Sequence, residues 1–133
     1  MSKLIKKDRL NIKNSGFTKE KARKLHDMLS QKTEDENLFV NPELTLVELA
    51  QSIDVHPNNL SQVINTFEKK NFYYYVNSKR IDLFKKIIES PESKKYTILS
   101  LAFDCGFNSK SSFNKYFKKE TNLIPTEYIK LLN

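Results

Sequence analysis

The chain has 133 residues, of which 38% are hydrophobic and 11% aromatic, enough for one modest core or two very small ones. Lys and Arg number 23 against 16 acids, and the resulting net charge of +7 favours a polyanionic partner such as nucleic acid. Cys105 is the single cysteine, which excludes an internal disulfide and a cysteine-based metal site. The apolar runs are too short to cross a membrane and no segment resembles a signal peptide, so we expect a cytoplasmic protein.

Apolar residues spaced three and four apart predict an all-α fold, which the two glycines and four prolines interrupt rarely. Residues 1–16 are basic and end at Gly16, so we interpret them as a tail or as the cut end of a longer protein. Residues 17–43 are predicted to hold an N-terminal helix, capped by Thr18, and a loop. The expected apolar face of this helix consists of Ala22, Leu25, Met28 and Leu29.

Residues 44–71 are predicted to form a first helix-turn-helix. Thr45 and Glu48 have the spacing of a capping box, and Pro57 suits the first turn of the second helix. The residues expected to face inward are Leu46, Leu49, Ala50, Ile53, Leu60, Val63 and Ile64. A long linker helix is expected within residues 72–90, with an inward stripe of Phe72, Tyr75, Val76, Leu83, Phe84, Ile87 and Ile88.

The pattern of the short helix pair then recurs. The segment "TLVELAQSIDV" at 45–55 matches "TILSLAFDCGF" at 97–107, and after one added residue Leu60 and Ile64 match Phe113 and Phe117. We therefore predict a second helix-turn-helix, followed by a C-terminal helix, within residues 91–133.

Gly106 stands where the second helix pair must reverse direction, and glycine adopts a left-handed backbone conformation at little cost. The first pair has Asp54 at the matching place, and Asp tolerates this conformation better than most residues. Cys105 is expected to be a small buried residue without a reactive role.

The second helix of each pair is expected to present polar side chains outward. In DNA-binding helix-turn-helix proteins this helix enters the major groove. Asn and Gln can bond adenine bidentately, whereas Lys reaches guanine acceptors or phosphates. The outward positions hold no acid: Asn58, Asn59, Ser61, Gln62 and Asn65 in the first pair, and Lys110, Ser111, Ser112, Asn114, Lys115 and Lys118 in the second.

At these residues the sequence resembles the C-terminal DNA-binding domain of AraC/XylS-family transcriptional regulators. The segment "ILSLAFDCGFNSKSSFNKYFKKETNLIPTEY" is close to the family signature, which ends in the Pro-x-x-Tyr of Pro125 and Tyr128. The first pair, with "LSQVIN" and "KNFYYYVNSKRI", resembles the version common in Bacteroidetes-type regulators. The likeness covers roughly residues 38–130.

The resemblance implies about seven helices and two recognition helices that enter successive major-groove segments of double-stranded DNA. It implies that Arg80 has a structural role, that RNA polymerase is a partner, and that any dimerisation uses a region outside this chain. It implies neither cofactor nor metal, and it allows a membrane-anchored sensor before the basic start. The implied base-reading residues are Asn58, Gln62, Ser111 and Lys115. The candidates for base or phosphate contacts are Asn59, Ser61, Asn65, Lys110, Ser112, Asn114, Lys118 and Lys119.

The sequence departs from the family pattern at three positions. Gln62 stands where many members have Arg, and Lys69 and Asn122 stand where a helix-ending glycine is usual. Lys69 should therefore take a left-handed conformation with some strain, or the helix should end differently. We expect phosphate attraction from Lys110, Lys115, Lys118, Lys119, Lys69, Lys70, Lys79 and Arg80.

Two other functions are compatible with the composition. A basic helical protein-interaction module would present exposed aromatic residues to an acidic partner, and Tyr73 and Tyr74 are candidates for such a surface. An enzyme is disfavoured, because the sequence contains no phosphate-binding loop and no nucleophile–base constellation, and because His26 and His56 lack the spacing of metal ligands.

Overall fold

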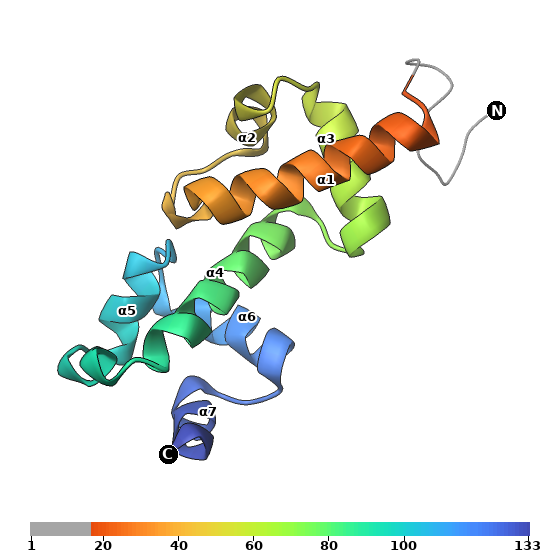
Figure 1. The fold of residues 1–133 in the computed structure, drawn as a ribbon. Coiled ribbons are helices and arrows are strands. Elements are labelled where there is room, and N and C mark those ends of the chain that lie inside the picture. The colour runs from red at the N-terminus through yellow and green to blue at the C-terminus, as the bar shows by residue number, and fades with distance from the viewer. Residues whose placement is uncertain (1–16) are drawn as a thin grey trace. The chain divides into compact units, whose positions relative to one another are not determined.

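The computed structural model describes residues 17–133, and seven α-helices account for most of them (Figure 1). They are α1 (Lys19–Glu36), α2 (Leu46–Ser52), α3 (Pro57–Val63), α4 (Phe72–Ile88), α5 (Ile98–Asp104), α6 (Lys110–Thr121) and α7 (Pro125–Leu132). The described residues contain no strand, which confirms the all-α prediction. Within the same residues, none of the helices has the length and apolar character needed to cross a membrane.

The described chain divides into two compact units. The first holds residues 17–38 and 44–72, and so includes α1, α2 and α3. The second holds residues 39–43 and 73–133, which include nearly all of α4 together with α5, α6 and α7. Each unit therefore contains one copy of the repeated helix pair.

In the first unit α1 packs against α3 (Figure 1). Thr18 caps α1 as predicted, because its hydroxyl accepts the backbone N–H of Lys21 at 3.1 Å. Leu25 and Leu29 are buried, but the prediction that Met28 faces inward is wrong, since 47% of it is exposed. Met28 follows Leu25 by three residues but lies at the edge of the buried face of α1. There it lines an open groove of about 400 Å³ rather than the core.

A side-chain pair that the sequence did not reveal ties α1 to the end of the first recognition helix. The Nε2 atom of His26 lies 2.6 Å from Oε2 of Glu68, and the His26 ring stacks on Phe67 with ring centroids 4.8 Å apart. Glu68 and Phe67 belong to a π-helical turn, Ile64–Glu68, that continues α3. The residues are 42 positions apart, so no local pattern could indicate the contact.

The two helix-turn-helix copies close their turns with the same backbone hydrogen bonds. The N–H of Val55 donates to Ala50 O at 3.0 Å, and the N–H of Phe107 donates to Ala102 O at 3.2 Å. Between them Asp54 has a φ of 57° and Gly106 a φ of 111°, as predicted for both positions. Ala50 and Ala102 have no exposed surface, so the repeat aligned from the sequence is also a structural repeat.

Both departures from the glycine pattern adopt the left-handed conformation. Lys69 has a φ of 59° directly after the π-helical turn, and Asn122 has a φ of 64° after α6. Asn tolerates this conformation through local hydrogen bonding, whereas Lys does so with some strain. The first copy differs from the second in having a π-helical turn directly before this left-handed residue.

Aromatic side chains form the core of the second unit. Phe84 of α4 meets Phe113 and Phe117 of α6 edge-on, with ring centroids 4.9 and 5.7 Å apart. Tyr128 of the Pro-x-x-Tyr motif packs edge-on against Phe117 at 5.3 Å, which fastens α7 to α6. Ile81 is fully buried in this core, although it was missing from the predicted stripe of α4.

Arg80 is buried in the second unit, with 8% of its surface exposed. Its guanidinium donates hydrogen bonds to the main-chain oxygens of Phe39 and Asn41 and to Oδ1 of Asn77, at 2.6, 2.9 and 2.8 Å. Burial lowers the pKa of Arg80 below its usual value. Three N–H groups of Arg80 thus bond inside the protein, which confirms the structural role implied for this residue rather than a direct contact with DNA. The bonds to Phe39 and Asn41 also explain why residues 39–43 belong to the second unit.

Candidate nucleic-acid interface

The first recognition helix, α3, begins at a cap that the sequence did not indicate. The Nδ1 atom of His56 accepts the backbone N–H of Asn58 at 3.1 Å, and Pro57 occupies the first helical position as predicted. Leu60, Val63 and Ile64 are fully buried, so the register of the helix is fixed by its core face. This register leaves the polar residues on the other side.

The candidate residues of α3 and of the turn that follows lie on this polar side. Asn58 and Asn65 are exposed, while Asn59, Ser61 and Gln62 are half-buried. The segment 57–66 carries no charged side chain. Any attraction for DNA at this surface would thus come from hydrogen bonding rather than from net charge.

The second recognition helix, α6, is capped by Ser109, whose hydroxyl accepts the N–H of Ser112 at 3.1 Å. Phe113 and Phe117 fix the buried face. The exposed candidates on the other side are Lys110, Ser111, Lys115, Lys118 and Lys119, and the half-buried ones are Ser112 and Asn114. The stretch 108–119 contains four lysines and no acid, which gives α6 a strongly basic surface.

Two tyrosines lie against the lysines of α6, a feature that the sequence did not indicate. The Tyr74 ring of α4 lies 5.6 Å from the Tyr116 ring, and the Lys119 Nζ atom lies 4.8 Å from the centre of the Tyr74 ring. The Lys115 Nζ atom lies 5.3 Å from the centre of the Tyr116 ring. Such contacts hold an ammonium group by attraction to the ring face, typically by about 0.5–1 kcal/mol at exposed sites. They restrict where Lys115 and Lys119 can reach.

Tyr74 is accordingly part of the contact between α4 and α6. Its pKa is raised above the usual value, mainly by burial and then by the nearby Glu120 carboxylate, to which it hydrogen-bonds. Tyr73, by contrast, is 66% exposed. The two adjacent tyrosines therefore do not form the shared exposed aromatic surface that a protein-interaction module would need.

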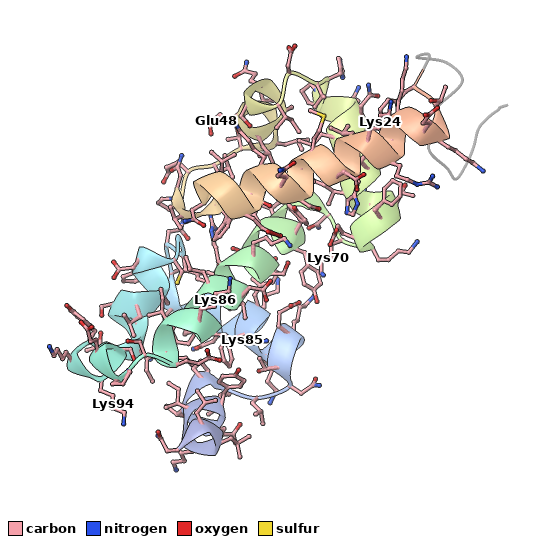
Figure 2. The ribbon with its side chains drawn as sticks, viewed as in Figure 1. Lys24, Glu48, Lys70, Lys85, Lys86 and Lys94 are labelled. Carbon is pink, nitrogen blue, oxygen red and sulfur yellow. The ribbon has the colours of Figure 1, made fainter. Side chains whose placement is uncertain are left out.

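Further basic residues lie outside the two recognition helices. Lys69 is exposed and Lys70 half-buried, while the Lys79 Nζ atom lies 5.4 Å from the centre of the Tyr75 ring. Figure 2 labels Lys85 and Lys86 on α4, and Lys94 on the 3₁₀ segment Pro91–Lys95. Lys79, Lys85, Lys86 and Lys94 make the second unit basic beyond α6, whereas Lys69 and Lys70 belong to the first unit. Lys69, Lys70 and Lys79 were predicted to attract phosphates.

Two observations concern the cysteine and possible metal ligands of the described residues. Cys105 has no exposed surface, and burial, with a smaller effect from Asp104, raises the pKa of its thiol to about 12, so the thiolate is not accessible near neutral pH. Within residues 17–133, no group of three or more His, Cys, Asp or Glu side chains is arranged to hold a metal ion.

The structure brings the candidate residues together in two sets. Asn58, Asn59, Ser61, Gln62 and Asn65 share the outer side of α3 and its continuation in the first unit, and Lys110, Ser111, Ser112, Asn114, Lys115, Lys118 and Lys119 share α6 in the second. Their individual roles in contacting DNA remain predictions.

Two structurally equivalent helix-turn-helix units, each presenting a polar second helix, define a DNA-binding domain of the transcription-regulator class. The chain belongs to the AraC-type helix-turn-helix family: residues 49–131 match the family described as "Helix-turn-helix domain". It is also similar to the HTH-type transcriptional regulator YijO of Escherichia coli, with 29% identity over 85 residues. That match covers 64% of this chain but only 29% of the relative's length.

Solved structures share the fold. A DNA-binding transcriptional dual regulator from Escherichia coli K-12 has a TM-score of 0.65 and 20% identity, covering 81% of this chain and 91% of that chain. The C-terminal domain of AraT, a response regulator from Geobacillus stearothermophilus, has a TM-score of 0.61 and 21% identity, covering 83% and 84%. The C-terminal domain of the two-component response regulator yesN from Fusobacterium nucleatum has a TM-score of 0.63 and 21% identity, covering 80% and 98%.

Proposed function

We propose that this chain binds specific sites in double-stranded DNA by placing α3 and α6 in successive major-groove segments. The observation that carries the proposal is the structural repeat itself, in which two matching helix pairs each present polar or basic side chains on the second helix, with no acid in residues 57–66 or 108–119. An acidic side chain at such a surface would be repelled by phosphates. If both helices dock on one face of the duplex, their contacts lie about one helical turn, or about 34 Å, apart.

The base-reading residues in this proposal are Asn58 and Gln62 on α3, and Ser111 and Lys115 on α6. All four lie on the polar side of their helix, and Asn58, Ser111 and Lys115 are exposed. Phosphate contacts are assigned mainly to Lys110, Lys118 and Lys119, with further attraction from Lys69, Lys70 and Lys79. The remaining candidates, Asn59, Ser61, Asn65, Ser112 and Asn114, contact either bases or phosphates.

The domain acts by binding rather than by catalysis, in the cytoplasm, and this part of the proposal is supported by the match to the helix-turn-helix family. The resemblance to AraC/XylS regulators makes RNA polymerase the protein partner. Any dimerisation would use a region outside these residues.

Selection of bound sequences from a random duplex pool, followed by a salt titration on the enriched site, tests the proposal. We expect a two-part motif with about one helical turn between its parts, and an affinity that falls steeply as salt rises. Weak binding to all duplexes alike, without enrichment, would contradict it. A single-stranded oligonucleotide of the enriched sequence serves as the control and should bind far more weakly.

A further inference from the structure

The two recognition helices differ sharply in chemistry although their backbones match. Segment 57–66 carries no charged side chain, whereas segment 108–119 carries four lysines. A symmetric division of work, in which each helix supplies both phosphate attraction and base readout, does not fit this difference. The uncharged helix can contribute to binding only through hydrogen bonds and close packing in the groove.

Three carboxamides form a stripe along the outer side of the first copy. Asn58, Gln62 and Asn65 are separated by four and three residues, a spacing that puts them on one side of a helix. Leu60, Val63 and Ile64 are fully buried on the opposite side, which turns the stripe outward. We call these three residues the amide stripe.

The side chains of the amide stripe are available for intermolecular hydrogen bonds. Within the part of the chain that the structure describes, none of the three carboxamides hydrogen-bonds to another side chain or to the backbone. The backbone N–H of Asn58 already has a partner, because it donates to Nδ1 of His56. A carboxamide offers a donor and an acceptor side by side, which matches N7 and the N6 amino group of adenine in the major groove.

We propose that the amide stripe makes the first copy a reader of adenines, so that one part of the operator is A·T-rich while α6 anchors the other part through its lysines. This inference rests on the proposed function, because it assumes that α3 enters the major groove. Gln62 is the central member, and it stands where an arginine would favour guanine instead. Binding to the A·T part should depend weakly on salt, because no phosphate charge is neutralised by the stripe.

The experiment compares selection from a random duplex pool by the unmodified chain and by Gln62→Ala, Gln62→Arg and Gln31→Ala. Gln31→Ala removes an exposed carboxamide from α1 and is the matched control. We expect adenines in one part of the motif for the unmodified chain and the control. Gln62→Ala should lose the preference for one adenine, and Gln62→Arg should replace that adenine by guanine.

A second measurement tests the hydrogen bond directly. Replacing each adenine of the enriched site by 7-deazaadenine removes the N7 acceptor and leaves base pairing intact. We expect the affinity of the unmodified chain to fall by about 5-fold or more at the position read by Gln62, as for a good base contact, and the Gln62→Ala variant to be indifferent there. The salt dependence should be equal for Gln62→Ala and the unmodified chain.

The outcomes separate this inference from the proposed function. An enriched two-part motif whose Gln62-dependent part is G·C-rich, or insensitivity to 7-deazaadenine throughout, would overturn the inference and leave the proposed function standing. No enrichment by the unmodified chain would overturn both. All variants replace residues outside the buried core, and an unchanged melting temperature confirms that each retains the fold.

Discussion

The Nε atom of Arg80 donates a hydrogen bond to the main-chain oxygen of Phe39 at 2.6 Å, across 41 positions of sequence. This bond holds segment 39–43 against α4, and it directs the guanidinium group of Arg80 into the protein. The same oxygen would lie 2.5 Å from a Cβ atom added to Gly106. The glycine of the second turn is thus required both by its backbone conformation and by the close approach of this segment.

Arg80→Lys should lower the free energy of unfolding by about 2–4 kcal/mol, because lysine cannot supply the three hydrogen bonds and hydrogen bonds to a charged group contribute about 1.5–3 kcal/mol each. Urea denaturation measures the change. The salt dependence of DNA binding, measured where the variant is folded, should not change. Lys79→Met is the control and should show the opposite result. Its stability should be nearly unchanged, whereas the slope of the logarithm of the binding constant against the logarithm of the salt concentration should be smaller by about 0.9.

Gly106→Val should destabilise the protein by about 2–4 kcal/mol, the combined cost of a strained backbone and an overpacked contact. The added side chain would meet Phe39 O, and its Cβ would also lie 2.6 Å from Arg80 Nε. Asp54→Gly at the equivalent turn should cause no loss of stability, because Asp54 already has a φ of 57°. Thermal unfolding measures the stability of both variants. An unchanged melting temperature for Gly106→Val would refute this role of the glycine.

Cys105 should make stability depend on pH above about 9. Burial raises the pKa of its thiol from 9.0 to about 12 in the folded state, so between these values the unfolded state has lost a proton that the folded state retains. The contribution of Cys105 to the free energy of unfolding is complete below pH 9. Above pH 9 it decreases by about 1.4 kcal/mol per pH unit. The difference in unfolding free energy between the unmodified chain and Cys105→Ala, measured from pH 8 to 10.5, should decrease with pH. A constant difference would show that the thiol ionises equally in both states.

Lys115→Ala should weaken binding to the specific site more than binding to unrelated duplex DNA, because we assign Lys115 to a base contact. Lys118→Ala should weaken both by similar factors, because we assign it to phosphate. Fluorescence anisotropy with the two kinds of duplex at several salt concentrations measures both effects. Equal losses for Lys115→Ala would reassign that residue to the phosphates.

The sequence was sufficient to predict the helices and the repeat, because both depend on local spacing. Thr18, Thr45 and Pro57 act at helix starts as their types suggest, and Gly106 and Asn122 take the left-handed turns expected of them. Contacts between residues far apart in sequence could not be predicted in this way. Two of the three hydrogen-bond partners of Arg80, Phe39 and Asn41, lie about 40 positions away.

The candidate site was predictable in outline but not in its details. Periodicity in the sequence indicates which residues are buried, and the polar faces of α3 and α6 follow from those buried residues. The positions of the lysine side chains cannot be predicted in this way, because Lys119 contacts Tyr74 of another helix. The cap at His56 was also missed, since histidine is not among the residues usually preferred at that position.

Interference by diethyl pyrocarbonate on the enriched duplex tests the central claim most directly, since this reagent modifies N7 of adenine and of guanine and so locates the purines that the protein contacts in the major groove. If α3 and α6 occupy successive major-groove segments, modified purines should interfere in two clusters on one face, about one helical turn apart. Gln62→Ala should weaken one cluster and Lys115→Ala the other. A single cluster affected by both substitutions, or interference spread evenly along the duplex, would contradict the account.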